Sequence, residues 1–174
     1  MPIYAPVFEA LYAADIPFLV IGGHAVVLHG YQRNTFDLDL LIAEGRLPAA
    51  KPVLLGLGYS SYFESAAFFQ LTPQVNLPPL DLMIVDQTTF DRLSLFTESR
   101  ILDGKRILIP DPTRLVALKL HALKAVSRPD REKDWADIAG VMRAAGLDLE
   151  NPEFQAIIQR YGPLESNAEL RRRL

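Results

Sequence analysis

The chain of 174 residues contains no cysteine. This absence excludes disulfide bonds, zinc–thiolate sites and cysteine nucleophiles, and it fits the cytoplasmic location that we expect. No apolar run approaches the roughly 18 residues of a membrane-spanning helix, so we expect no membrane partner. A signal peptide is not expected either, because the N-terminus has no basic segment and Glu9 and Asp15 interrupt its apolar run.

Repeats and low-complexity segments are absent, and the histidines are few. His24, His29 and His121 lie at spacings that do not favour a shared metal site, so each is expected to be structural. No Ser/His/Asp pattern is present. Charged residues make up 22% of the chain, which is typical of a globular protein and excludes a disordered one.

The net charge is −3, which argues against nonspecific binding to nucleic acid, but the charges are unevenly distributed. Residues 88–133 hold ten of the eighteen Lys and Arg residues and only six acids. A locally basic segment beside an acidic remainder suits an anionic, metal-chelated ligand. A solvated helix and hairpin would explain the same pattern equally well.

Short strands and helices alternate first, and helices follow alone. This order predicts an α/β (α+β) fold, in which residues 1–110 form a mixed sheet flanked by helices and residues 111–174 form a helical part packed on it as one compact unit. Arg128-Pro129 should break a long apolar helix. Strands are predicted over 18–21, 36–42, 68–71 and 80–85, with a hairpin of 101–102 and 106–109, and helices over 7–14, 24–29, 47–57, 88–95, 112–126, 131–145, from 152 and from 163.

Two aspartates stand two residues apart in the predicted strand 36–42. Alternate residues of a strand share one face, about 6–7 Å apart, so Asp37 and Asp39 should lie side by side. Their apolar neighbours, including Phe36 and Leu38, indicate a buried strand. A buried pair of like charges costs several kcal/mol unless a cation compensates it, which favours a metal site over solvated carboxylates.

Asp81 is the candidate third ligand. It stands near the start of the predicted strand 80–85, after Pro78-Pro79, and a neighbouring strand would place it beside the first pair. Three carboxylates can hold two Mg²⁺ ions about 3.5–4 Å apart, enough for an in-line phosphoryl displacement. Asp86, at the other end of the same strand, is the weaker alternative because it falls at a turn.

Gly22-Gly23 ends the first predicted strand and opens a short helix. Glycines let backbone N–H groups approach a ligand closely, and a helix N-terminus attracts anions. A Gly-Gly pair is a weak signal alone, and its place fourteen residues before Asp37 strengthens it.

Together these features resemble the DNA polymerase beta-like nucleotidyltransferase superfamily. The combination of Gly-Gly-His-Ala at residues 22–25 with Arg33-x-Thr35-x-Asp37-x-Asp39 looks most like the minimal bacterial nucleotidyltransferases, which are related to the abortive-infection and toxin–antitoxin transferases. Residues 119–124, Arg128 and residues 131–138 resemble the second block of that group.

The resemblance implies that Asp37, Asp39 and Asp81 bind magnesium and carry the catalysis, and that Asp81 activates an acceptor hydroxyl. It also implies contacts from Gly22 and Gly23 to the phosphates of the nucleotide, ATP being one candidate. Many members have a serine where this chain has Gly23, so one side-chain phosphate contact is missing.

Several charged residues have two interpretations. Lys119 lies on a helix that is apolar nearly all round, so it either reaches outward or points into a cleft, where it would pair with a phosphate or with Asp134. Arg33 is either a phosphate ligand or a surface charge, and with Thr35 it completes the expected nucleotide site. Asp134 and Asp137 are expected to pair with nearby cations. The terminal Arg171–Arg173 run is expected to complement its helix dipole rather than to bind RNA.

The leading hypothesis is a magnesium-dependent nucleotidyltransferase that moves NMP from an NTP to a hydroxyl group and releases pyrophosphate. The acceptor implied by the resemblance is a tRNA 3′ end or a protein, as in a toxin with a cognate antitoxin. One alternative is an aminoglycoside nucleotidyltransferase, with a small-molecule acceptor. Another is a catalytically silent nucleotide-binding module or toxin partner.

Overall fold

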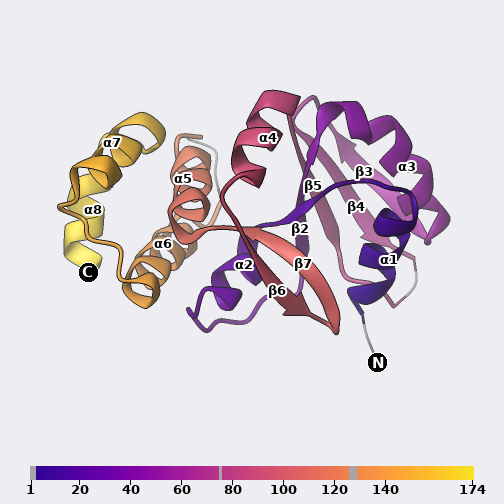
Figure 1. Cartoon of the computed structure of the whole chain (residues 1–174), viewed down its shortest axis with the longest axis horizontal. Helices are drawn as coiled ribbons and strands as arrows, with labels where there is room; N and C mark the ends of the chain where they lie inside the picture. The colour runs from indigo at the N-terminus through magenta and orange to yellow at the C-terminus, as the bar shows by residue number, and fades with distance from the viewer. Residues whose placement is uncertain (1–2, 75, 126–128) are drawn as a thin grey trace. The chain divides into compact units, whose positions relative to one another are not determined.

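The computed structural model describes residues 3–74, 76–125 and 129–174. The chain forms two compact units, one of Met1–His24 with Asn34–Pro110 and one of Ala25–Arg33 with Asp111–Leu174. Figure 1 shows their helices and strands. The predicted α/β class, with a mixed sheet and a helical C-terminal part, is confirmed. Val126 and Arg128, near the predicted end of one helix, lie outside the described residues.

The first unit is built on a five-stranded sheet in the order β1-β2-β5-β4-β3. Only β2 and β5 run parallel; the other neighbours are antiparallel. A separate hairpin of β6 and β7 turns at Asp103-Gly104, as predicted, and both turn residues have positive φ. The strands are β1 (Leu19–Val20), β2 (Leu38–Ala43), β3 (Tyr59–Glu64), β4 (Phe68–Pro73), β5 (Leu80–Val85), β6 (Thr97–Leu102) and β7 (Lys105–Pro110).

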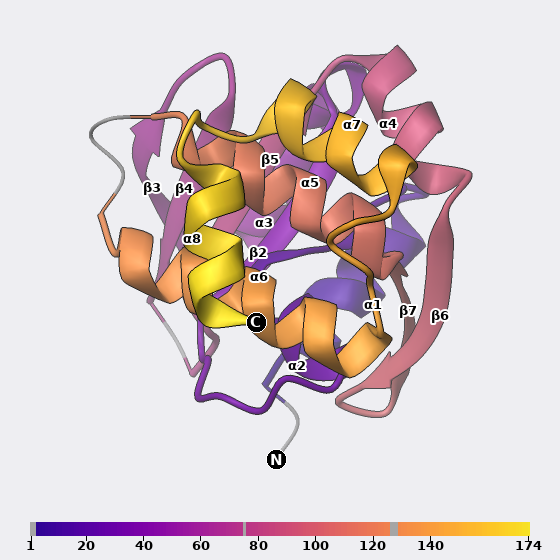
Figure 2. The ribbon, with the colours of Figure 1, turned by 90° about the vertical axis from the view of Figure 1, so that its left-hand side faces the viewer.

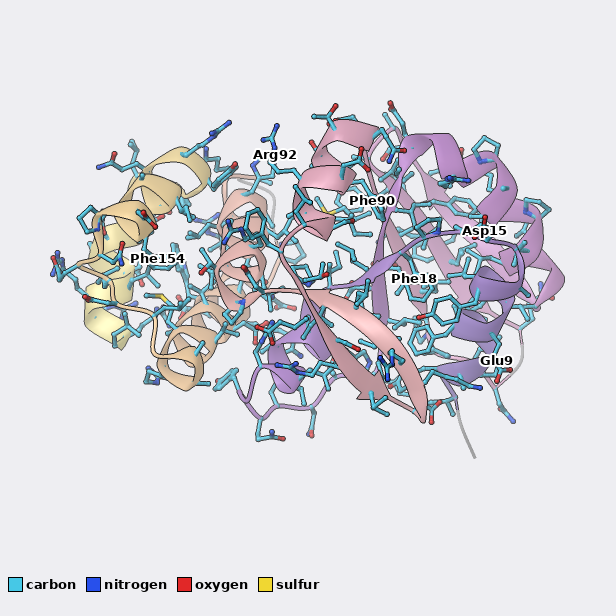
Figure 3. All side chains as sticks on the ribbon, in the orientation of Figure 1. Glu9, Asp15, Phe18, Phe90, Arg92 and Phe154 are labelled. Carbon is cyan, nitrogen blue, oxygen red and sulfur yellow. The ribbon has the colours of Figure 1, made fainter. Side chains whose placement is uncertain are left out.

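Helices α1 (Ala5–Ala13), α3 (Leu47–Gly56) and α4 (Gln87–Ser94) accompany this sheet, with the 3₁₀ turn Glu44–Arg46 before α3. Helix α1 packs against α3, α3 against β3, and α4 against β2. Phe18, labelled in Figure 3, follows α1 in the chain. Its ring stacks on that of Phe8 of α1, with the centroids 5.6 Å apart. Alternating apolar residues bury one face of the sheet completely: Leu38, Leu40, Phe69, Leu71, Leu80 and Leu82.

Two details of this unit differ from the sequence prediction. Strand β2 begins at Leu38, so Asp37 lies just before it, and Phe36 is 55% exposed rather than buried. Strand β3 was not predicted, because it is an edge strand whose residues 61–64 are all exposed. Such a strand needs no apolar alternation, which is the signal that identifies strands in a sequence.

The second unit is helical. Helix α2 (Gly22–Leu28) spans the boundary between the units, and α5 (Pro112–Leu123), α6 (Arg131–Ala145), α7 (Pro152–Tyr161) and α8 (Ser166–Arg173) follow. Helix α5 packs against α6 and α7, and α6 packs against α8 (Figure 2). Among the described residues, no helix combines the length and the apolar character that crossing a bilayer requires.

Candidate active site

The centre of the candidate site is a pair of aspartates on the two parallel strands. Asp39 of β2 and Asp81 of β5 are opposed in register, so their side chains leave the same face of the sheet from strands about 5 Å apart. Both are half-buried, on the face opposite the leucine core. Asp37, two residues before Asp39, is exposed. The neighbouring strand therefore brings Asp81 to Asp39, as the sequence predicted.

Gln70 of β4 extends this row of polar side chains across a third strand. It is opposed to Asp81 in register, and its amide Nε2 donates a 2.8 Å hydrogen bond to Oδ2 of Asp81. This contact fixes the orientation of the carboxyl group. The sequence interpretation missed Gln70, although a single polar residue inside the apolar strand 68–71 was the available signal.

The surroundings of Asp81 disfavour its negative charge. Burial is the largest cause that raises the pKa of Asp81 above its ordinary value of 3.8, and the charge of Asp37 raises it further. The hydrogen bond from Gln70 opposes both effects. Two carboxylates close enough to repel each other favour a proton or a cation between them.

Replacing Asp81 with Asn should stabilise the protein at neutral pH. Since the folded-state pKa is raised, ionising Asp81 costs more in the folded than in the unfolded chain, and stability falls as pH rises from 3.8 through the folded value. Asp81→Asn removes this penalty and keeps an acceptor for Gln70. We expect the variant to have a higher free energy of unfolding than the parent at pH 7. This difference should shrink as the pH falls from the folded-state pKa of Asp81 toward 3.8. Urea titrations of both proteins across this pH range measure it.

Asp86 gives a matched control of opposite sign at the other end of β5. It caps α4, and hydrogen bonds from the hydroxyl and the backbone N–H of Thr89 lower its pKa below 3.8. Its stabilising contribution is therefore lost as pH falls. Asp86→Asn should destabilise the protein at neutral pH, and less so in acid. Equal pH dependence of the two variants would contradict the environment described for Asp81.

The Gly22 turn lies directly against Asp39. Gly22 has φ +58°, and a Cβ atom added to it would stand 1.9 Å from Oδ2 of Asp39. Only a residue without a side chain lets the carboxylate approach the backbone here, since other residues are strained at such φ values. A glycine at position 22 is thus needed for the placement of Asp39.

Gly22→Ala should therefore reduce both stability and activity. Left-handed backbone costs a non-glycine residue about 1–2 kcal/mol. The added methyl group also displaces Asp39, and such a misplacement in an active site can cost about 10²-fold in rate. Gly56→Ala is the control, because no atom lies within 4 Å of a Cβ there and the site is at the end of α3. Thermal unfolding and turnover of both variants test this prediction. Equal stability and equal activity of Gly22→Ala and Gly56→Ala would contradict it.

The donors present suit magnesium. Within the described residues, no three His, Asp or Glu side chains stand close enough to hold a metal by themselves. The structure gives a reason: Asp39 is turned against Gly22, and Gln70 holds one oxygen of Asp81. Mg²⁺ usually takes one or two carboxylates together with substrate phosphates and water, rather than an all-protein cage. Asp39 and Asp81, with Asp37 nearby, provide hard oxygen donors of that kind.

The second unit holds the two predicted phosphate-binding cations in a buried ion cluster. Lys119 Nζ lies 3.0 Å from Asp134 Oδ1 and 2.7 Å from Asp137 Oδ2, so the predicted pairing with Asp134 is confirmed. Arg33 contacts the same Asp137 through Nε at 2.7 Å and Nη2 at 3.1 Å. The two positive charges of this cluster balance its two negative charges. Thr35 is half-buried in the segment between α2 and β2. The role of these residues in nucleotide binding stays a prediction.

No protein-family model and no curated protein matches the chain in sequence. Its structure, however, is similar to solved nucleotidyltransferases. ANT(2″)-Ia, in complex with adenylyl-2″-tobramycin, has a TM-score of 0.65 at 16% identity, over 91% of this chain and 96% of that one. Lincomycin-bound LnuA, a lincosamide antibiotic adenylyltransferase, has a TM-score of 0.57 at 15% identity, over 79% of this chain and 93% of that one.

A third similar structure is an antigenic nucleotidyltransferase-like protein from Paracoccidioides brasiliensis. It gives a TM-score of 0.55 at 14% identity and covers 96% of this chain and 90% of that one. Identities this low establish the fold alone. The chain has the nucleotidyltransferase fold, as its motifs predicted, with two opposed aspartates on adjacent parallel strands.

Proposed function

We propose that this protein is a magnesium-dependent nucleotidyltransferase that transfers NMP from an NTP to a hydroxyl group. The observation that carries the proposal is the register of β2 and β5, which opposes Asp39 and Asp81 on one face of a nucleotidyltransferase fold. Asp39 and Asp81 would hold Mg²⁺ together with substrate phosphates, and Asp37 as a third ligand and a second ion stay predictions of the sequence resemblance. When bound, Mg²⁺ neutralises triphosphate charge and polarises the reacting phosphoryl group.

The protein's own residues then have separate tasks. Gly22 and Gly23 contact the phosphates through the backbone, and Asp39 lies beside that turn. Asp81 accepts the proton of the acceptor hydroxyl, a task suited by a pKa raised above that of an ordinary aspartate. Gln70 orients the Asp81 carboxyl group through its hydrogen bond.

The transfer balances in one displacement. The acceptor oxygen forms a bond to the α-phosphorus as the bond from that phosphorus to the β-phosphate oxygen breaks. Pyrophosphate leaves, and the proton passes from the acceptor to Asp81. The in-line geometry needs the acceptor and the leaving group on opposite sides of the α-phosphorus.

Nucleotide binding and transfer test the proposal together. The protein is titrated calorimetrically with each Mg·NTP, and it is then incubated with α-labelled NTPs and a mixture of tRNA and small-molecule alcohols. We expect binding of at least one Mg·NTP, weakened in Asp39→Asn, and label on an acceptor. Binding with no transfer to any acceptor favours the silent module, and no binding at all contradicts the proposal.

A toxin-like role with a tRNA or protein acceptor and a cognate antitoxin is the finer prediction of the sequence resemblance. The small-molecule alternative is supported by the likeness to ANT(2″)-Ia and LnuA, whose names refer to antibiotic substrates. The two predictions differ in the charge and size of the acceptor that the surface around Asp81 would bind.

A further inference from the structure

Three exposed aromatic side chains gather at the β3–β4 edge of the sheet. Tyr62 is 61% exposed, Phe63 48% and Phe68 39%. Large rings are seldom left in water as a group unless they take part in binding. Their place relative to the aspartates indicates what they bind.

The register of the sheet puts these rings on the face that carries Asp81. Phe63 is opposed to Gln70, and Gln70 is opposed to Asp81, so all three share a face. Phe68 is opposed to Met83, two residues along β5 from Asp81, and therefore lies on that face too. The aromatic side chains thus continue the row of Asp39, Asp81 and Gln70 toward the edge of the sheet.

A register shift between Ser61 and Phe63 makes Tyr62 the extra residue of a β-bulge. Bulges re-aim side chains, and they are frequent beside active sites. Tyr62 lies within electrostatic range of the aspartates: burial raises the pKa of its phenol first, and the charges of Asp81 and Asp37 raise it further. Tyr62 is therefore positioned to contact a molecule that reaches Asp81.

The strands β3, β4 and β5 themselves contain no positively charged residue. No lysine or arginine occurs between Lys51 and Arg92, a segment that contains β3, β4 and β5 and four acids. Proteins hold RNA mainly through Lys and Arg contacts to phosphates. The aromatic edge therefore suits a molecule without negative charge, whose ring can lie against Tyr62 and Phe68.

We propose that the acceptor is an uncharged or cationic small molecule, whose ring lies on Tyr62 and Phe68 while one of its hydroxyl groups faces Asp81. This inference rests on the proposed function. The strand order supports it: the Gly22 turn lies beside Asp39 on one side of the row, and the aromatic side chains lie beyond Asp81 and Gln70 on the other. Nucleotide and acceptor thus approach the aspartates from opposite sides.

An acceptor panel tests the chemical class. The full chain is incubated with Mg²⁺ and α-labelled NTPs, and separately with tobramycin, lincomycin, 4-nitrophenyl glucoside or total tRNA. We expect label on at least one small molecule and none on tRNA. Label on tRNA, or on no small molecule, overturns the inference. The proposed function is judged independently by Asp39-dependent binding of Mg·NTP.

Variants of the aromatic edge test the placement. Tyr62→Ala and Phe68→Ala should raise the KM of the labelled small molecule about three- to tenfold, the range of an aromatic contact, and leave the KM of the NTP unchanged. Tyr62→Phe keeps the ring and should stay close to the parent. Phe96→Ala removes a ring that is 44% exposed elsewhere in the first unit, and it should change neither constant. An unchanged acceptor KM in both alanine variants overturns the placement.

Discussion

Asp39→Asn is expected to abolish nucleotidyl transfer while leaving the protein folded. The change removes one charge from the pair of aspartates that would share Mg²⁺ and the triphosphate, and it keeps the shape of the side chain. Loss of such a preorganised electrostatic group costs about 10²–10³-fold in rate. The measurement is release of labelled pyrophosphate in the presence of an acceptor, with circular dichroism to confirm the fold.

Asp86→Asn is the matched control for this experiment. Asp86 is another aspartate of the first unit, but it caps α4 at the far end of β5 from Asp81. Its substitution should leave the transfer rate unchanged. An Asp39→Asn protein as active as the parent would contradict the role given to Asp39, and a loss of activity in Asp86→Asn would show that the site includes the other end of the strand.

Lys119→Met should destabilise the protein by about 3–5 kcal/mol, the cost of removing one partner from a buried ion pair. Lys119 is 8% exposed, and it lies between Asp134 and Asp137, which are 5% and 0% exposed. Methionine fills a similar volume, so the loss is mainly of charge. Asp134 then keeps its negative charge inside the helical unit without that lysine.

The fluorescence of Trp135 can follow this unfolding, because it is the single tryptophan and is buried on α6 beside Asp134. Arg171→Met is the control. Arg171 pairs with Glu150 at the surface, where ion pairs contribute about 0–1 kcal/mol. If Lys119→Met unfolds like the parent in urea and instead weakens NTP binding, Lys119 is a nucleotide ligand rather than a structural cation.

Local patterns predicted the parts of the site that depend on nearby residues. The aspartate inside an apolar strand identified Asp39, although β2 begins only after Asp37, and the apolar strand 80–85 identified the partner of β2. The glycine turn was predicted as a phosphate contact, which stays a prediction, and the contact of Gly22 with Asp39 was not predicted. These signals depend on strand periodicity and on backbone sterics, both of which a short segment of sequence contains.

The remaining parts depend on contacts between distant segments. Arg33 pairs with Asp137 across 104 residues, and no local pattern encodes that pairing. Gln70 and Tyr62 join the site only because β4 stands beside β5 and β3 stands beside β4, and the exposed β3 lacks the apolar alternation that would have identified it. The residues contributed by β4 and by the edge strand β3 were therefore missed, although those of the two parallel strands were found.

The most direct measurement is a crystal structure of the protein with Mg²⁺ and a nonhydrolysable NTP. We expect the metal to be bound by oxygens of Asp39 and Asp81 at about 2.0–2.1 Å, with the triphosphate extending toward Gly22. A nucleotide bound elsewhere on the protein, or a metal that neither aspartate contacts, would contradict the account.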